Sequence, residues 1–334
     1  MNFYGRDFLK IMDYSEAELR HVLNVAKRFK QLKHNHQPHA SLRGKNIALL
    51  FEKTSTRTRC AFEVAAHDLG AHVTYLDPTG SQMGHKESIA DTARVLDRFY
   101  DGIEFRGFAQ STVETIAQYA SAPVWNGLTD YCHPTQALAD FMTLEEHFNT
   151  LKGLTLAFVG DIKNNVSNSL MAMSAKMGMN FILCGPKERQ PDPNLFTECQ
   201  SLATKNGATL TITHDINSLN GVADAIYTDV WLSLGEPPEQ WQERINLLKP
   251  YQVTMNVMNQ AKPTTVFLHA LPSFHDLNTT IAQDIHTRFN LSEMEVTNEV
   301  FESDRSLVFD EAENRMHTIK AIIFLSLYQQ KEAQ

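Results

Sequence analysis

Short apolar runs alternate with amphipathic stretches along most of the chain. An apolar run bounded by polar or turn-forming residues predicts a buried strand, and apolar residues three or four positions apart predict a helix. The predicted strands are residues 47–51, 72–76, 102–105, 124–126, 154–159, 180–184, 209–213, 225–228 and 266–268. The predicted helices are residues 15–33, 58–69, 89–99, 114–120, 133–147, 169–177 and 313–328. Strands that alternate with helices imply a parallel, doubly wound sheet, so the predicted fold class is α/β.

The strand, turn, helix, strand pattern starts again near Leu151, which predicts two α/β lobes. We place the first lobe at residues 1–148 and the second at residues 149–314. The C-terminal helix is apolar enough to dock on one of these domains, since it carries Ile319, Ile322, Ile323 and Leu327. A chain of 334 residues with 43% hydrophobic content is long enough for two such cores.

The net charge of -9 argues against a nucleic-acid or anionic-membrane surface, because both require basic patches. A bound anion must therefore be held by a local cluster of positive groups. The four cysteines show no paired metal-binding spacing and no dense disulfide framework, which indicates a reducing, cytoplasmic compartment. Residues 1–7 show no signal-peptide pattern, and no apolar run reaches the roughly 20 residues that span a bilayer.

The segment Ser55-Thr56-Arg57-Thr58-Arg59 lies where the strand at 47–51 gives way to the helix at 58–69. A helix N-terminus presents unpaired N–H groups and a partial positive charge, and a guanidinium group matches phosphate oxygens. The segment therefore predicts an anion site. Arginines in a first helical turn are unfavourable unless an anion is bound there. The alternative is a Ser or Thr helix cap beside two surface arginines.

Polar side chains also follow other predicted strands. Arg106 and Asp229 each come directly after one and His133 follows another within seven residues, and the carboxyl ends of parallel strands share the edge where ligands bind. His133 could donate to an oxygen at this edge, or it could be a loop histidine at a helix cap. Asp229 could be a turn residue, although a carboxylate in this position would suit a cationic amine.

The residues that follow the strand at 154–159 do not favour a dinucleotide-binding site. The Rossmann fingerprint requires three spaced glycines after such a strand, and this chain offers only Gly160. Nicotinamide binding is therefore not predicted.

Four segments in order resemble the signature of the aspartate/ornithine carbamoyltransferase family. They are Ser55-Thr56-Arg57-Thr58, His133-Pro134-Thr135-Gln136, Asp229 with Ser233-Leu234-Gly235, and His269-Ala270-Leu271-Pro272. Together with residues 82–88 and 313–320, the resemblance covers essentially the whole chain. It favours the ornithine branch, because the aspartate branch would be expected to show Pro where Ala270 stands. The resemblance implies two lobes joined by interdomain helices, with the active site in the cleft between them and a C-terminal helix, about 315–334, packed back on the first lobe.

The resemblance also implies a reaction and the roles of residues in it. The side-chain amine of L-ornithine would attack carbamoyl phosphate, giving L-citrulline and phosphate. The first lobe would bind carbamoyl phosphate, and the residues implied for that site are Ser55, Thr56, Arg57, Thr58, Gln82, Arg106, His133, Gln136, Ala270, Leu271 and Arg315. The second lobe would bind ornithine through Asn165, Asp229, Ser233 and Leu234. Arg57, Arg106 and His133 would be catalytic, as donors to the charge that develops on the carbonyl oxygen.

The resemblance further implies a homotrimer, or an assembly of trimers, in which Gln82 reaches the site of a neighbouring subunit. No metal or other cofactor is expected, because the amine is the nucleophile and the guanidinium groups polarise the carbamoyl group. The family function suggests arginine biosynthesis, although the sequence does not decide between the biosynthetic and the catabolic direction.

Two residues depart from the ornithine branch, which usually has Cys at the position of Ala270 and Met at that of Leu234. Loss of the thiol removes a weak hydrogen-bonding group beside the ornithine side chain, so weaker ornithine binding is expected. Two alternatives remain open. One is a carbamoyltransferase for another amine, such as putrescine or an acylated ornithine. The other is an inactive relative that binds carbamoyl phosphate or a protein partner.

Overall fold

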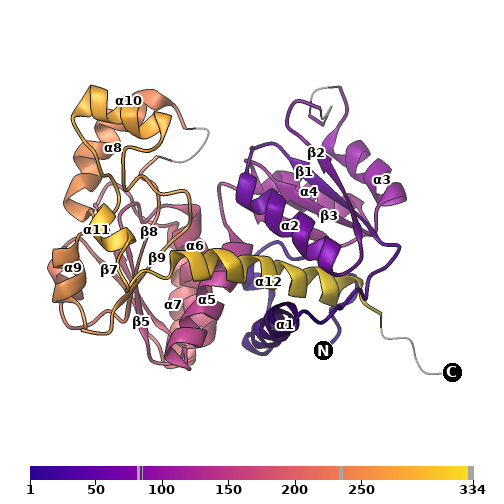
Figure 1. Ribbon diagram of the computed structural model, residues 1–334, viewed down its shortest axis with the longest axis horizontal. Coiled ribbons are helices and arrows are strands. Elements are labelled where there is room, and N and C mark those ends of the chain that lie inside the picture. Colours follow the sequence, from indigo (N-terminus) through magenta and orange to yellow (C-terminus); the bar gives the residue numbers. More distant parts are fainter. Residues whose placement is uncertain (81–82, 85, 233–235, 330–334) are drawn as a thin grey trace. The chain divides into compact units, whose positions relative to one another are not determined.

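The computed structural model in Figure 1 describes residues 1–80, 83–84, 86–232 and 236–329. The chain divides into two compact units, one formed by Met1–Met142 with Ala312–Gln334 and the other by Thr143–Glu311. Both boundaries fall inside helices, namely α5 (Pro134–Phe148) and α12 (Val308–Leu327), so each of these helices contributes residues to both units. Within the described ranges, no helix combines the length and the apolar character needed to cross a membrane.

The first unit contains a four-stranded parallel sheet in the order β2-β1-β3-β4. Its strands are β1 (Asn46–Phe51), β2 (His72–Leu76), β3 (Gly102–Arg106) and β4 (Val124–Leu128). Its other helices are α1 (Glu16–His34), α2 (Thr56–Asp68), α3 (Ile89–Phe99) and α4 (Gln110–Tyr119). The chain leaves β1 toward β2 and then returns to β3 and β4, so right-handed crossovers place α2 on one face and α3 with α4 on the other. The direction in which the chain steps across the sheet reverses between β1 and β3. Ligands of such sheets bind beside this switch point.

The second unit contains a five-stranded parallel sheet in the order β7-β6-β5-β8-β9. Its strands are β5 (Thr155–Val159), β6 (Asn180–Cys184), β7 (Leu210–Thr213), β8 (Ala225–Thr228) and β9 (Val266–His269). Its other helices are α6 (Asn165–Met177), α7 (Pro193–Lys205), α8 (Trp241–Leu248), α9 (Met255–Gln260), α10 (Thr280–Phe289) and α11 (Asn298–Phe301). Here the switch point lies between β5 and β8, since the chain runs from β5 to β6 and β7 and later from β8 to β9.

The predicted fold class is confirmed, because both sheets are parallel and doubly wound. Every predicted strand is present with its ends within two residues. The helix starts were predicted less well. Both α4 and α6 begin four residues before the predicted positions, and α12 begins five residues before. The first turn of α6 is polar and is capped by the Asn164 side chain, which accepts from the Val166 amide, so apolar periodicity alone does not reveal it.

The core of the first unit depends on a close approach between β3 and β4. Trp125 is fully buried, and its indole Nε1 donates to Ser326 Oγ at 3.0 Å. The ring lies directly on Gly102, because a Cβ there would be 2.9 Å from Trp125 Cζ3 and 3.0 Å from Cζ2. At such short distances an added Cβ would force the Trp125 ring or the backbone to move. Only glycine therefore fits this position.

We expect Gly102→Ala to lower the free energy of unfolding by about 1–3 kcal/mol, because a packed indole ring cannot move away cheaply. Urea denaturation followed by circular dichroism measures the change. Gly80→Ala is the control, since the nearest atom to its Cβ would be 3.5 Å away. Equal stability of the two variants would contradict this account of the packing.

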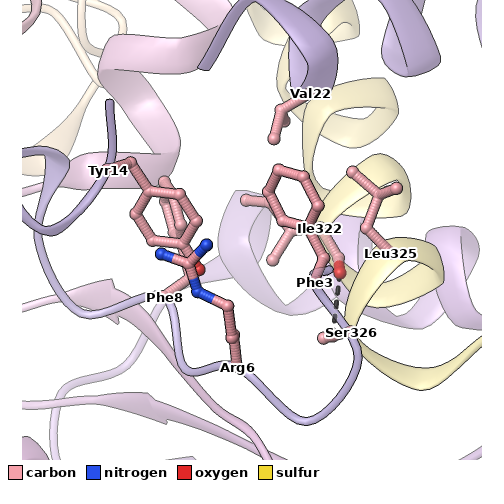
Figure 2. A pocket seen from close by; sticks show the side chains of 8 residues that line it. All are labelled: Phe3, Arg6, Phe8, Tyr14, Val22, Ile322, Leu325 and Ser326. Atoms are coloured by element: carbon pink, nitrogen blue, oxygen red, sulfur yellow. Dashed lines mark hydrogen bonds between the residues drawn. The ribbon is translucent and has the colours of Figure 1, made fainter. Parts of the chain in front are cut away.

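The N-terminal segment is held against the first sheet and α12. The Phe8 amide donates to the Val124 carbonyl at 2.8 Å, and the Gly5 amide donates to the Ser326 carbonyl at 2.9 Å. Figure 2 shows the small cavity left beside this segment, lined by Phe3, Arg6, Phe8, Tyr14, Val22, Ile322, Leu325 and Ser326. None of the predicted site residues that the structure describes lines this cavity.

Candidate active site

The N-terminus of α2 lies at the switch point of the first sheet. Ser55 is its cap, and the Ser55 hydroxyl accepts from the Thr58 amide at 3.2 Å. Thr56 is the first helical residue and is exposed, and Arg57 is half-buried. Arg59 behaves differently from Arg57, because it donates to Glu63 at 2.8 Å and stacks over the Tyr75 ring at 4.0 Å. Arg59 therefore forms a surface ion pair. Arg57 has no acidic partner at this turn in the described part of the chain.

Thr58 joins three elements of the first unit. Its Oγ1 accepts from Arg106 Nη1 at 3.2 Å and from Arg315 Nη2 at 2.8 Å, so a strand end and the helix α12 meet at the first turn of α2. Arg315 also donates to the Gly127 carbonyl at 3.4 Å. All three side chains are buried. Because the hydroxyl accepts twice, its own proton is available to a further acceptor.

The electrostatics of this cluster favour an anion. Burial lowers the pKa of Arg106 to about 10 and that of Arg315 to about 9, with a further lowering from the neighbouring guanidinium groups. The Nε atoms of Arg106 and Arg315 are buried and have no acceptor among the described residues. Buried N–H groups without partners and like charges in close proximity are both stabilised by a bound anion. The predicted anion site thus has the local charge that it needs within an acidic chain.

Glu104 lies beside the arginines in the centre of β3 and is fully buried. Burial raises the pKa of its carboxyl group well above the usual range, while Arg106 and Arg315 act in the opposite direction. A Cβ on Gly127 would collide with the Glu104 carboxylate, so the glycine creates the space that this group occupies. The sequence reasoning missed Glu104, although an acidic residue within an otherwise buried strand is a recognisable signal.

His133 and Gln136 lie at the start of α5 and complete the part of the predicted site in the first unit. His133 is buried, and burial together with Arg315 and Arg106 lowers its pKa well below 6.5. The imidazole is therefore neutral at physiological pH and can donate one N–H without adding a fourth positive charge. Gln136 Nε2 donates to Asp140 Oδ1 at 2.8 Å, and Asp140 in turn interacts electrostatically with Arg315.

In the second unit, Asp229 directly follows β8, at the switch point beside β5. Its Oδ2 accepts from Asn164 Nδ2 at 2.8 Å. Burial raises the pKa of Asp229 to about 6, although His269 and the Asn164 hydrogen bond favour the ionised form. Asn164 was not among the residues that the sequence singled out. Asn165 is the first residue of α6, next to this pair.

Ala270 and Leu271 follow β9 and are placed next to Asp229 by the register, since Thr228 pairs with His269. Glu295 secures this turn. Its Oε1 accepts from Ser273 Oγ at 3.0 Å, from the Phe274 amide at 2.6 Å and from His269 Nε2 at 3.2 Å. Glu295 is fully buried, and its pKa is lowered because the bonds from His269 and the Phe274 amide outweigh burial. Glu295 holds the turn after β9, and the sequence prediction did not include it.

Three predicted site residues, Gln82, Ser233 and Leu234, lie outside the described residues. The remaining predicted residues fall into two sets. The first unit contains Ser55, Thr56, Arg57, Thr58, Arg106, His133, Gln136 and Arg315, and the second contains Asn165, Asp229, Ala270 and Leu271.

Comparison with known families assigns both units. Residues 6–146 match the carbamoyl-P binding domain of aspartate/ornithine carbamoyltransferase, and residues 152–326 match its Asp/Orn binding domain. The parallel sheets and the arginine site therefore define a two-domain α/β transferase of the carbamoyltransferase class. The chain belongs to the aspartate/ornithine carbamoyltransferase family. The predicted family resemblance is thereby confirmed.

Individual relatives match over nearly the whole chain. The catabolic ornithine carbamoyltransferase of Treponema denticola is 57% identical over 326 residues, which cover 98% of this chain and 96% of the relative. Catabolic ornithine carbamoyltransferase 1 of Streptococcus agalactiae serotype III is 53% identical over 98% of this chain and 99% of its own. Among solved structures, ornithine carbamoyltransferase from Pyrococcus furiosus is 40% identical with a TM-score of 0.90 over 98% of each chain. The enzyme from Thermus thermophilus is 38% identical with a TM-score of 0.79 over 96% of this chain and 97% of that one.

Proposed function

We propose that this enzyme transfers the carbamoyl group of carbamoyl phosphate to the side-chain amine of L-ornithine, and that it also catalyses the reverse reaction. The products of the transfer are L-citrulline and phosphate. The observation that carries the proposal is the contact of Thr58 with Arg106 and Arg315 in the unit that matches the carbamoyl-P binding domain. The ornithine acceptor is supported by the names of the relatives and by the buried Asp229 in the other unit.

In this proposal the phosphate group binds to Ser55, Thr56, Arg57, Thr58, Arg106 and Arg315. The helix N-terminus and the guanidinium groups neutralise it and later stabilise the leaving phosphate. Arg57, Arg106 and the neutral His133 donate to the carbonyl oxygen as negative charge develops there, and such donors act most strongly when they are already fixed in place. Gln136, Ala270 and Leu271 contact the carbamoyl group.

Ornithine is assigned to Asn165, Asp229, Ser233 and Leu234. The Asp229 carboxylate would pair with the α-ammonium group, which leaves the side-chain amine to react in its neutral form. Pairing with a cation would also lower the pKa of Asp229 from its raised value in the free enzyme.

We infer that the physiological direction is catabolic, from citrulline and phosphate to ornithine and carbamoyl phosphate. The support is that the Treponema and Streptococcus relatives carry that name, which speaks against the predicted role in arginine biosynthesis. Both directions use the same anion site, because phosphate is a reactant in one and a product in the other.

A cytoplasmic location is proposed from the thiols. All four cysteines are free, and Cys132, Cys184 and Cys199 are buried in the packed units. A chain that keeps such thiols without disulfides suits a reducing compartment.

A panel of amines tests the acceptor. Purified enzyme is given carbamoyl phosphate with ornithine, putrescine, N-acetylornithine or aspartate, and the carbamoylated product is measured for each. Ornithine is expected to give the highest kcat/KM by at least about 100-fold, because a site with a buried carboxylate discriminates strongly against ligands that leave it unpaired. Preference for putrescine would refute the acceptor proposed here, and absence of product with every amine would refute the enzyme activity.

We further propose a homotrimer, or an assembly of trimers, with Gln82 contributed to a neighbouring subunit's site. Gln82→Ala and Arg57→Ala enzymes are each expected to be nearly inactive. Mixed, dissociated and reassembled, they should regain activity, because some sites would then combine an intact Gln82 with an intact Arg57. A mixture that remains as inactive as its parents, with trimers present by light scattering, would contradict shared sites.

Ala270→Cys is expected to lower the KM for ornithine, because the thiol would restore a weak hydrogen-bonding group beside Asp229. Steady-state kinetics at saturating carbamoyl phosphate measure the change. Ala270→Ser serves as the matched variant, since a hydroxyl has a similar size and stronger hydrogen bonding. If Cys leaves both KM and kcat unchanged, the proposed weakening of ornithine binding by Ala270 is wrong.

A further inference from the structure

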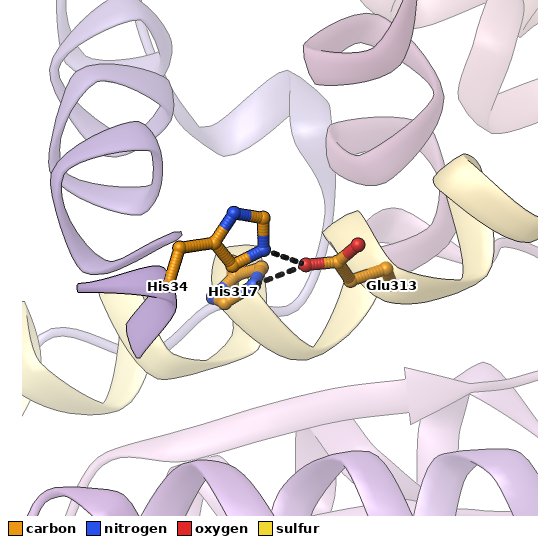
Figure 3. Close-up of side chains that lie close together, drawn as sticks. All are labelled: His34, Glu313 and His317. Carbon is orange, nitrogen blue, oxygen red and sulfur yellow. Dashed lines mark hydrogen bonds and ion pairs between the residues drawn. The ribbon is translucent and has the colours of Figure 1, made fainter. Parts of the chain in front are cut away.

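Two histidines and a glutamate of the first unit gather on one side of α12, away from the residues of the proposed reaction. Glu313 and His317 are four residues apart on this helix, and His34 comes from the last turn of α1 (Figure 3). Glu313 Oε1 lies 2.8 Å from His34 Nε2 and 3.2 Å from His317 Nε2. The three ligand atoms all lie within 4.8 Å of one another. Both imidazole Nε2 atoms are thus directed at the same carboxylate oxygen.

These spacings are close to those of a metal centre. Ligands about 2.1 Å from a tetrahedral Zn²⁺ ion are about 3.4 Å apart, so side-chain shifts of up to about 1 Å or slightly more would admit the ion. Two histidines with one carboxylate form a known zinc ligand set, with solvent in the remaining position. His34 and Glu313 are exposed enough to provide a path for entry, whereas the His317 side chain is fully buried.

The buried ring of His317 contacts Glu313 through its Nε2 atom. The other ring nitrogen of His317, Nδ1, is buried and has no hydrogen-bond partner in the part of the chain that the structure describes.

We propose that His34, Glu313 and His317 bind a divalent transition-metal ion of the zinc class. The ion would replace two hydrogen bonds by three coordination bonds and would fix α1 to α12. Arg315 lies between Glu313 and His317 in sequence, about 200° around the helix from Glu313, so the ion would hold the turn of α12 that presents Arg315 to Thr58 on the other side.

The surroundings limit the affinity. Lys30 lies close by, donating to Asn314 Oδ1 at 2.8 Å, and its charge opposes that of a cation. His317 lacks the outer partner that usually orients a ligating imidazole, as far as the described residues show. Micromolar binding is therefore expected. Lys30→Gln should tighten it, because this substitution removes a positive charge beside the site and leaves the three ligands in place.

Titration calorimetry with ZnCl₂ on the full chain, freed of metal by a chelator, tests the site directly. The expected result for wild type is one ion per chain with micromolar affinity and a rise in Tm on saturation. His34→Ala and Glu313→Gln should each weaken binding at least about 10-fold, as loss of one ligand from a three-ligand site requires. His67→Ala is the matched control, since His67 is also an exposed histidine in the last turn of a helix, α2.

The Cys60→Ser background removes the one exposed thiol among the four cysteines, so that a thiol cannot account for the heat. Circular dichroism confirms that each variant is folded. Unchanged zinc affinity in both His34→Ala and Glu313→Gln would overturn the proposal, as would the absence of binding by wild type at submillimolar zinc. None of these readouts depends on turnover, so the result stands apart from the proposed reaction.

Discussion

Arg57→Ala is expected to reduce kcat by at least about 100-fold, the typical effect of removing one donor from preorganised charge stabilisation. Arg57 is the guanidinium on the first turn of α2, and it interacts electrostatically with Arg106 and Arg315. Its loss removes positive charge from the phosphate and the carbonyl oxygen together. Citrulline formation at saturating substrates measures kcat, and varying carbamoyl phosphate gives its KM.

Arg59→Ala is the matched control for this substitution. It removes the same side chain from the same helical turn, but from a position already occupied by the Glu63 ion pair and the Tyr75 ring. Its kcat is expected to stay within about twofold of wild type, because exposed ion pairs contribute little. Normal turnover in Arg57→Ala, or equal losses in the two variants, would contradict the role given to Arg57.

The strands, and the position of the arginine segment at a helix start, were predictable because their signals are local. Most of β1 is an uninterrupted apolar run, and the segment with Ser55 and Arg57 begins after three further residues. The starts of α4, α6 and α12 and the helices between residues 193 and 301 were missed because the prediction relied on apolar periodicity alone. The start of α7, with Asp192 as its cap and Pro193 at its first position, was a readable signal that apolar periodicity does not include.

Long-range relations could not be predicted from the sequence in the same way. Strand order decides where the switch points fall, and nothing local in β1 or β3 specifies that they are neighbours. The hydrogen bond from Arg315 to Thr58 spans 257 positions. Glu295 acts on the turn after β9 from 21 to 26 positions away. Family resemblance supplied Arg315, whereas Asn164 and Glu295 became visible only through burial and contacts.

The pH profile of kcat/KM for ornithine is expected to change slope near pH 6. Asp229 in the free enzyme has its pKa raised to about 6 by burial, so it is ionised above that pH and protonated below it. The reacting amine of ornithine, like that of lysine, has a pKa near ~10.4 and must be neutral to attack. Hence log kcat/KM should rise by about one per pH unit between pH 6 and 10, and by about two per unit below pH 6.

Asp229→Asn separates these two ionisations. The variant should lose the change of slope at pH 6 and keep a single slope of about one, because only the amine then titrates. Its kcat/KM at pH 8 should fall by about 10- to 100-fold, the effect of removing a hydrogen bond between charged groups. The profile for carbamoyl phosphate at saturating ornithine is the internal control. It should show no change of slope at pH 6, since bound ornithine lowers the pKa of Asp229. A change of slope that persists in Asp229→Asn would assign the ionisation to another group and remove Asp229 from the ornithine site.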